Sequence, residues 1–197
     1  MKRKWSRWSL AAGALALSAT AFAQTPAQTP PTPEMVSFAC AGCHGTNGGS
    51  AGLLMPSLAS QSKESIVDAM KKFQSGERTS SIMGRLAKGF TEADFEAMGE
   101  FFSKQKFHAT NQKLDKAKVK KGAALQEANC SRCHLDDGKD GKDDTPVMAS
   151  QWLPYLQVQM DMYLSGARKM PEQMAEKVKP LSREELDALL HFYASVK

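Results

Sequence analysis

The motif C-x-x-C-H occurs twice in this chain of 197 residues, and the two copies contain all four of its cysteines. The first copy ends at His44 and the second at His134, so equivalent positions lie 90 residues apart. Two thiols on one helical turn can each add to a vinyl group of haem, and the histidine that follows can bind the iron. The pattern therefore predicts two covalently attached haem c groups.

The predicted attachment residues are Cys40 and Cys43 in the first motif and Cys130 and Cys133 in the second. Three alternatives use the same cysteines: a pair of disulfides, a redox-active C-x-x-C, or one zinc ion bound by four thiolates. A disulfide framework does not need a histidine after each pair, and a zinc–thiolate site is a poorer fit to an oxidising compartment. If haem is attached at both motifs, no cysteine remains for a structural disulfide.

The sequence similarity between the two halves continues beyond the motifs. Pro56 aligns with Pro146 at the offset of 90, and one extra residue in the second half then shifts the offset to 91, which aligns Met83 with Met174. Shared offsets over whole halves indicate a duplicated unit rather than a local coincidence.

Each repeat is predicted to contain three main helices around one haem, which makes the fold all-α. Helices are expected over 63–76 and 153–166, where apolar residues have helical spacing and a glycine stands at the end. The last helix of each repeat should begin after Thr91 or Ser182, because each is followed three residues later by an acidic residue, as in a capping box. No strand pattern competes with these helices.

Residues 1–23 have the features of a secretory signal peptide. A basic start precedes an apolar run over 10–23, which ends in a small-x-small pattern at Ala23. The alternative is an uncleaved membrane anchor, but the run is shorter than the roughly 20 residues needed to span a bilayer. We expect cleavage after Ala23, export to the periplasm, and no membrane span in the mature chain.

The remaining chain divides by composition and by the repeat. We expect a proline-rich N-terminal tail at 24–33, a first domain at 34–107, a polar linker at 108–118 and a second domain at 119–197. The net charge of +5 falls to nearly zero once the four basic residues of the leader are removed. Because no Lys/Arg-rich run remains, the sequence gives no support to nucleic-acid binding. A large nucleotide- or flavin-binding domain is excluded by the short chain and the missing G-x-G-x-x-G.

The repeat also selects the axial ligands of the two irons. His44 and His134 are the predicted proximal ligands, and Met83 and Met174 follow them by 39 and 40 residues. Each of these methionines lies eight residues before the predicted cap of the last helix in its repeat. Met170 remains the alternative for the second haem. A methionine ligand closes the iron to small molecules and raises its reduction potential.

Two prolines and two further histidines complete the candidate residues. The carbonyl groups of Pro56 and Pro146 are expected to accept a hydrogen bond from the haem-ligating histidines; the alternative is that each proline merely turns its loop. His108 and His191 lack a cysteine partner, and we expect both to be exposed rather than to bind iron.

Three segments resemble the cytochrome subunit of flavocytochrome c sulfide dehydrogenase, a dihaem class I cytochrome c. They are 38–46, 81–90 and 150–156, and in the last of these Ser150 replaces a glycine of the family. The resemblance covers essentially the whole mature chain. It implies two tandem class I cytochrome c units, each wrapped around one haem.

The resemblance also implies a function and a partner. In that family a larger flavoprotein oxidises sulfide at a flavin and a redox-active disulfide, and the first haem unit of the cytochrome docks on it. This chain would not be an enzyme on its own: it would take the two electrons of the flavin and pass them singly to a soluble cytochrome acceptor.

Two other functions fit parts of the sequence. The first is a stand-alone carrier of the cytochrome c-four type, between a quinol-oxidising complex and a terminal oxidase. The second is a haem enzyme with an open iron, which Met83 and Met174 disfavour.

Overall fold

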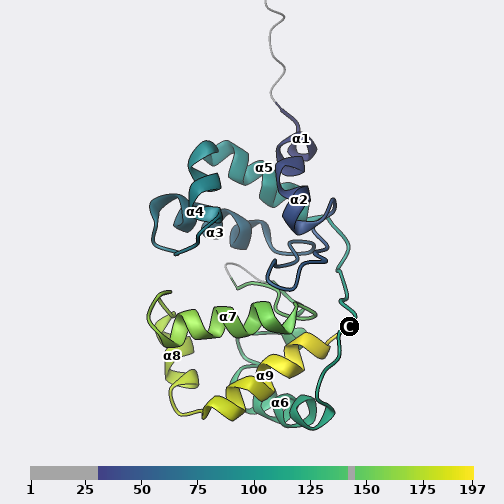
Figure 1. The fold of residues 1–197 in the computed structure, drawn as a ribbon, viewed down its shortest axis with the longest axis vertical. Coiled ribbons are helices and arrows are strands. Elements are labelled where there is room, and N and C mark those ends of the chain that lie inside the picture. Colours follow the sequence, from purple (N-terminus) through teal and green to yellow (C-terminus); the bar gives the residue numbers. More distant parts are fainter. Residues whose placement is uncertain (1–30, 142–144) are drawn as a thin grey trace, which may run out of the picture. The chain divides into compact units, whose positions relative to one another are not determined.

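The computed structural model describes residues 31–141 and 145–197, and Pro31–Lys197 form one compact unit. The described residues form helices and no strands, so the predicted all-α class is confirmed (Figure 1). The predicted signal peptide at 1–23, its cleavage position and most of the predicted tail at 24–33 lie outside the described residues. Within the described ranges, no helix has the length and apolar character needed to cross a membrane.

The first repeat contains short helices around its motif and two longer helices behind it. They are α1 (Pro33–Ser37), α2 (Ala41–His44), α3 (Lys63–Ser75), α4 (Met83–Leu86) and α5 (Glu92–Ser103), with 3-10 turns at Phe38–Cys40 and Ala87–Gly89. Helix α3 ends at Gly76, whose φ of +84° is the left-handed conformation that glycine adopts readily. Helix α5 begins with the predicted capping box of Thr91 and Asp94.

The second repeat has counterparts of α1, α3, α4 and α5 in the same order, but its motif forms turns where the first repeat has α2. It contains α6 (Lys116–Asn129), α7 (Leu153–Leu164), α8 (Glu172–Val178) and α9 (Arg183–Ser195), with a 3-10 turn at Asp136–Gly138. The predicted capping box at the start of α9 is present, between Ser182 and Glu185. Helix α6 begins inside the predicted linker, because the Asp115 carboxylate accepts hydrogen bonds from two backbone N–H groups of its first turn.

The linker packs against the second repeat rather than running free. Thr110 is buried; its N–H group donates to Ser150 Oγ at 2.7 Å and its hydroxyl donates to the Ser150 carbonyl at 2.8 Å. The Gln112 side chain donates to the Gln151 carbonyl and accepts from the Leu153 N–H group. The polar residues of the linker, which predicted a free spacer, instead form hydrogen bonds with buried backbone groups of the second repeat.

The helix nearest the motif packs on the last helix in each repeat, and α3 and α7 pack on the same last helices to complete the cores. Helix α1 packs on α5, and α6 packs on α9. The second of these crossings is close, because a Cβ atom at Gly122 would lie only 2.1 Å from the carbonyl oxygen of Ala188. The core of the first repeat includes Ile66, Met70, Phe95, Met98 and Phe102, and that of the second includes Leu156, Leu186, Leu189, Phe192 and Tyr193.

Candidate haem sites

The first motif lies on a 3-10 turn that continues into α2, and its histidine is buried and held by a hydrogen bond. His44 Nδ1 lies 2.8 Å from the Pro56 carbonyl oxygen. Because a carbonyl can only accept, Nδ1 carries the proton and Nε2 is left with a lone pair for a metal. Burial lowers the pKa of His44, against the opposing effect of the Pro56 hydrogen bond, and favours the neutral imidazole that binds iron.

The second motif differs at this point, and the predicted contact with Pro146 is not formed. His134 Nδ1 is buried without a hydrogen-bond partner in the described part of the chain. The loop that follows the histidine explains the difference, since Asp136 and Asp137 have φ of +47° and +55°, and the first repeat has no non-glycine residue of this kind before Pro56. The altered path leaves the Pro146 carbonyl without the role that Pro56 has.

A polar contact from α6 holds the second motif instead. Gln126 Nε2 donates to the His134 backbone carbonyl at 2.8 Å, and the Tyr193 hydroxyl donates to Gln126 Oε1. The Tyr193 ring also lies edge-on to the His134 imidazole, with ring centroids 6.1 Å apart. Burial raises the pKa of Tyr193, and the neighbouring Cys130 raises it further. The phenol therefore keeps its proton and can donate it in a hydrogen bond.

The four cysteines lie in two separate pairs, and none of them forms a disulfide. Cys40 and Cys130 are half-buried, and burial raises the pKa of both thiols, whereas Cys43 and Cys133 are exposed. No group of three or more His, Cys, Asp or Glu side chains that could hold a metal ion occurs within 31–141 and 145–197. The cysteines therefore do not converge as four thiolate ligands of zinc would.

The predicted methionine ligands pack in the same clusters as the motifs. Met83 begins α4 and is half-buried in the cluster that contains Cys40. Met174 lies in α8 and is half-buried in the cluster that contains Cys130. Each repeat thus brings a thioether, an imidazole and two thiols into one region. This donor set fits haem c, whose iron takes His and Met as axial ligands.

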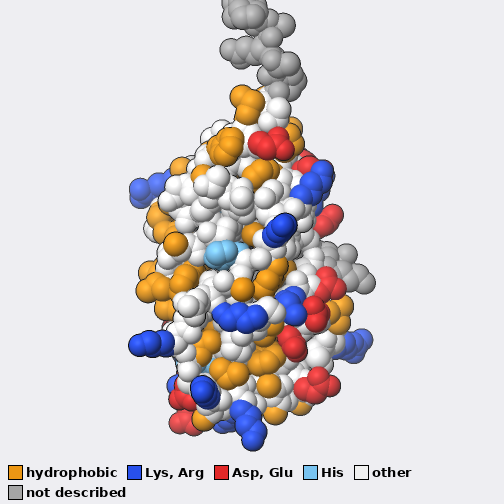
Figure 2. Space-filling view, turned by 90° about the vertical axis from the view of Figure 1, so that its right-hand side faces the viewer, with side chains coloured by type: hydrophobic (Ala, Val, Ile, Leu, Met, Phe, Trp, Pro, Cys, Tyr) orange, Lys and Arg blue, Asp and Glu red, His pale blue; other side chains and the backbone are white. Residues whose placement is uncertain are grey.

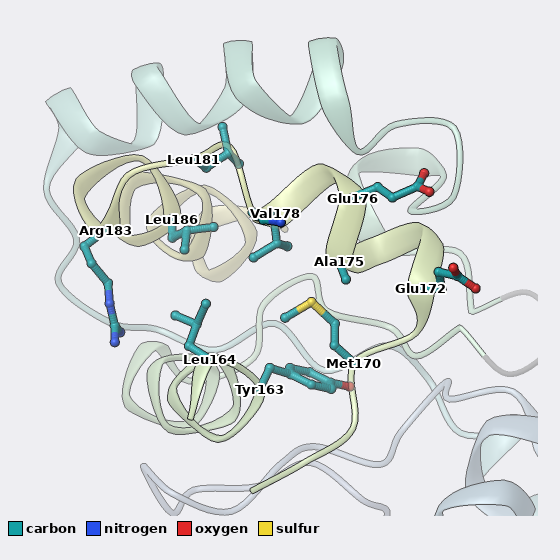
Figure 3. Close-up of a pocket in the computed structure, with 11 residues that line it drawn as sticks. Tyr163, Leu164, Met170, Glu172, Ala175, Glu176, Val178, Leu181, Arg183 and Leu186 are labelled. Atoms are coloured by element: carbon teal, nitrogen blue, oxygen red, sulfur yellow. The ribbon is translucent and has the colours of Figure 1, made fainter. Parts of the chain in front are cut away.

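Met170 also packs in the second cluster, but its side chain lines a cavity that Met174 does not line. It points toward Ala175 and Val178 in a cavity of about 570 Å³ (Figure 3). The side chains of Tyr163 and Leu186 also line this cavity, whereas neither Met174 nor any residue of the second motif does. Met174 stays the predicted ligand from its spacing in the repeat, and Met170 stays the alternative.

The two remaining histidines have different surroundings. His108 is exposed, as predicted. The prediction that His191 is exposed was wrong: only 8% of its surface is accessible, because α9 packs on α6. Its Nδ1 accepts a hydrogen bond from the N–H group of Asp115, the residue that caps α6, and its Nε2 lies 3.7 Å from Asp187.

Parts of the chain are similar to known proteins. Residues 117–192 match the family model described as cytochrome C oxidase, cbb3-type, subunit III. Over 69 residues the chain is 45% identical to the cytochrome subunit of sulfide dehydrogenase of Chlorobaculum tepidum, which covers 35% of this chain and 62% of that protein. Over 151 residues it is 26% identical to the thiosulfate dehydrogenase electron acceptor of Thiomonas intermedia, which covers 69% of this chain and 66% of that one. Both matches span less than two thirds of the relative's length.

The fold is that of a solved dihaem protein. The crystal structure of reduced recombinant cytochrome c4 from Pseudomonas stutzeri superposes with a TM-score of 0.74 at 21% identity, over 84% of this chain and 97% of that one. The second repeat is therefore a cytochrome c domain, and the two repeats together have the architecture of two tandem class I cytochrome c units. The C-x-x-C-H motif in each repeat, together with these similarities, supports covalently bound haem c. Over part of its length the chain is similar to the cytochrome subunit of sulfide dehydrogenase.

Proposed function

We propose that this chain is the electron-accepting subunit of a periplasmic flavocytochrome c sulfide dehydrogenase. It would receive electrons from the flavin of a larger partner subunit and pass them singly to a soluble cytochrome. A haem c group in each repeat supplies a one-electron centre, so the chain has room for both electrons of a two-electron donor. The identity to the Chlorobaculum tepidum subunit supports this assignment.

The proposal assigns a role to each candidate residue of the two sites. Cys40 and Cys43 attach the first haem, and Cys130 and Cys133 attach the second. His44 with Met83, and His134 with Met174, are the axial ligands of the two irons. With both axial positions filled by side chains, the irons exchange electrons without binding a substrate.

The observation that carries the proposed docking is an uneven distribution of exposed apolar side chains. Met35 and Phe38, just before the first motif, are 62% and 57% exposed, and Ile82 and Leu86, on either side of Met83, are 47% and 50% exposed. In the second repeat the largest such values are 44% at Val158 and 38% at Leu135. Exposed apolar groups that gather near a functional site mark an interaction surface.

This surface suits a stable partner better than a brief electrostatic encounter. The mature chain is nearly neutral if the leader is removed, so long-range charge steering contributes little to docking. Figure 2 shows hydrophobic side chains at the surface among scattered charges of both signs. We propose that the first repeat docks on the flavoprotein through Met35, Phe38, Ile82 and Leu86.

The first test is a mild, native purification of the chain from its own host, with an absorption spectrum of every haem-containing fraction. Flavin that co-elutes at a fixed ratio to haem supports the proposal. A flavin-free protein with a two-haem spectrum contradicts it and favours a stand-alone carrier. N-terminal sequencing of the same sample tests export, because cleavage after Ala23 leaves Gln24 as the first residue.

A matched pair of variants tests the docking surface. Phe38→Ser with Ile82→Ser should release flavin from the purified complex, because Phe38 is exposed just before the first motif and Ile82 is exposed just before Met83. Val158→Ser with Leu164→Ser removes two exposed apolar groups of the second repeat and should leave the flavin-to-haem ratio unchanged. Equal loss in both pairs would contradict docking through the first repeat.

A further inference from the structure

Two buried glutamines join the repeats, and each contacts the backbone of the other repeat. Gln151 Oε1 accepts from the N–H group of Ser57, and Gln151 Nε2 donates to the Ser57 carbonyl, both at 2.9 Å. Gln61 makes the same two hydrogen bonds with Val147, also at 2.9 Å. Gln61 and Gln151 occupy equivalent positions, as do Ser57 and Val147, so the pairing is reciprocal.

The residue held by each glutamine is next to the proline that faces a haem-ligating histidine. Ser57 directly follows Pro56, whose carbonyl accepts the hydrogen bond from His44 Nδ1. The Pro56 carbonyl and the Ser57 N–H group belong to one planar peptide unit. Gln151 Oε1 holds the N–H side of this unit, and its carbonyl accepts the hydrogen bond from His44 Nδ1. The second repeat therefore supplies the group that holds the His44 acceptor in place.

The backbone before each glutamine is adapted to this contact. Ser60 and Ser150 have φ of +63° and +56°, a left-handed conformation that is uncommon for residues other than glycine. The N–H groups of both serines bond to carbonyls of the last helix of their own repeat, Phe102 and Tyr193. Strained residues of this kind persist where the surrounding structure fixes them and cluster at functional sites.

We propose that Gln151 is a positioning residue for the first haem and acts across the boundary between the repeats, through the Pro56 carbonyl, on His44. A strong hydrogen bond from Nδ1–H makes the imidazole a better donor to iron, which stabilises the ferric state. Loss of the Gln151 contacts loosens that hydrogen bond and raises the reduction potential of the first haem. The proposal rests on His44 as an axial ligand and does not depend on the flavoprotein partner.

The reciprocal contact should have a smaller effect. Gln61 holds Val147 next to Pro146, but His134 Nδ1 makes no hydrogen bond within the described residues. Because His134 makes no such hydrogen bond, removal of Gln61 cannot weaken one. The difference between the two glutamines is a readout that a merely structural role at the boundary would not produce.

The test is a redox titration of the isolated holoprotein, with NMR signals that separate the two haems and report the His44 Nδ1–H proton. Gln151→Met keeps the side-chain volume and removes both hydrogen bonds. At the wild-type midpoint potential, this variant should raise the reduced-to-oxidised ratio of the first haem about fivefold. Such a change equals the free energy of roughly one hydrogen bond and a rise of about 40 mV in reduction potential. Gln61→Met should change the ratio of the second haem less than about twofold.

Gln159→Met is the matched control, since it removes another hydrogen bond between the repeats, the one from Arg78 at 3.1 Å, far along the sequence from Pro56. It should leave the first haem and the His44 proton unchanged. If Gln151→Met does not yield holoprotein, Gln151→Asn serves, because its amide is too short to reach both Ser57 groups. An unchanged His44 proton signal in the Gln151 variant, or an equal shift in the control, overturns the proposal.

Discussion

At equivalent positions beside the motifs, the first repeat has Val36 and Phe102 where the second has Gln126 and Tyr193. In the first repeat both side chains are apolar and buried, and the histidine is fixed by the Pro56 carbonyl. In the second, Gln126 Nε2 donates to the backbone carbonyl of His134, and the Tyr193 hydroxyl donates to Gln126 Oε1. Nδ1 of the His134 imidazole has no hydrogen-bond partner among the described residues.

A glycine turn near each of these sites, by contrast, is nearly the same in both repeats. Gly48 and Gly138 have φ of +80° and +81°. The carbonyl of each accepts two N–H groups from its own repeat, at 2.7–3.1 Å. The duplication therefore preserved this glycine turn, whereas the path just before it, at Asp136 and Asp137, and the groups around each imidazole diverged. Each haem can thus be tuned separately in one scaffold.

The largest expected effect is the loss of one haem. Cys130→Ala with Cys133→Ala should halve the haem-to-protein ratio and unfold the second repeat, because a unit of this size buries little apolar surface without its haem. Cys40→Ala with Cys43→Ala should do the same to the first repeat. The measurements are pyridine haemochrome content and the helical signal in circular dichroism. Retention of both haems in either variant would refute the attachment sites.

The next effect separates the methionines. Met83→Leu and Met174→Leu should each open one iron, so that half of the ferrous haem binds carbon monoxide and one reduction potential falls. Met170→Leu is the control and should leave both irons closed. Carbon monoxide spectra decide between Met170 and Met174. If carbon monoxide binds to the Met170 variant but not to the Met174 variant, Met170 is the ligand and Met174 is not.

A smaller effect tests the crossing of α6 and α9. Gly122→Ala should destabilise the protein by about 1–3 kcal/mol, because the added methyl group meets the Ala188 backbone, which cannot move aside as a side chain can. Gly42→Ala, in the first motif, adds the same group where no atom lies within 4 Å. Thermal unfolding of the two holoproteins should show a lower midpoint for Gly122→Ala alone; similar midpoints would mean that the crossing is looser than described.

A double-mutant cycle tests the polar pair that distinguishes the second repeat. Tyr193→Phe leaves the buried Gln126 oxygen without its donor and should cost about 1–3 kcal/mol. Gln126→Val with Tyr193→Phe reproduces the residues of the first repeat and should cost less than the sum of the two single changes. Simple additivity in denaturant unfolding would show that the two side chains do not act as a pair.

The smallest effect is a dependence on acid. Hydrogen bonds from the backbone N–H groups of Lys118 and Ala117 lower the pKa of Asp115 below 3.8. A carboxylate with a lowered folded-state pKa contributes stability above its unfolded pKa and loses it as the pH falls through the folded value. When the pH is lowered below about 4, the temperature of the unfolding midpoint should therefore decrease. Asp115→Asn should make this decrease smaller. An equally steep pH profile in the variant would assign it to other carboxylates.

Local signals were enough to predict much of the molecule. The motifs, the repeat and the capping residues Thr91 and Ser182 depend on a few neighbouring positions, and the structure forms both capping boxes. Fold class followed from the helical spacing, because no strand pattern competed. The axial methionines came from spacing alone and stay predictions.

The features that were missed depend on long-range packing. The burial of His191 results from the contact of α9 with α6, and the missing Pro146 contact results from left-handed residues at Asp136 and Asp137. The hydrogen bonds of Gln151 reach a residue 94 positions away. A signal for them was present in the repeat, since Gln61 and Gln151 are equivalent and both follow a serine.

The most direct test of the account is a potentiometric titration of the purified holoprotein, followed by absorption and by proton NMR of the axial methionine methyl groups. The account predicts two haems per chain, two one-electron steps, two sets of coordinated methionine signals from Met83 and Met174, and no carbon monoxide binding to the ferrous protein. A single haem, or one iron without a methionine ligand, would contradict it.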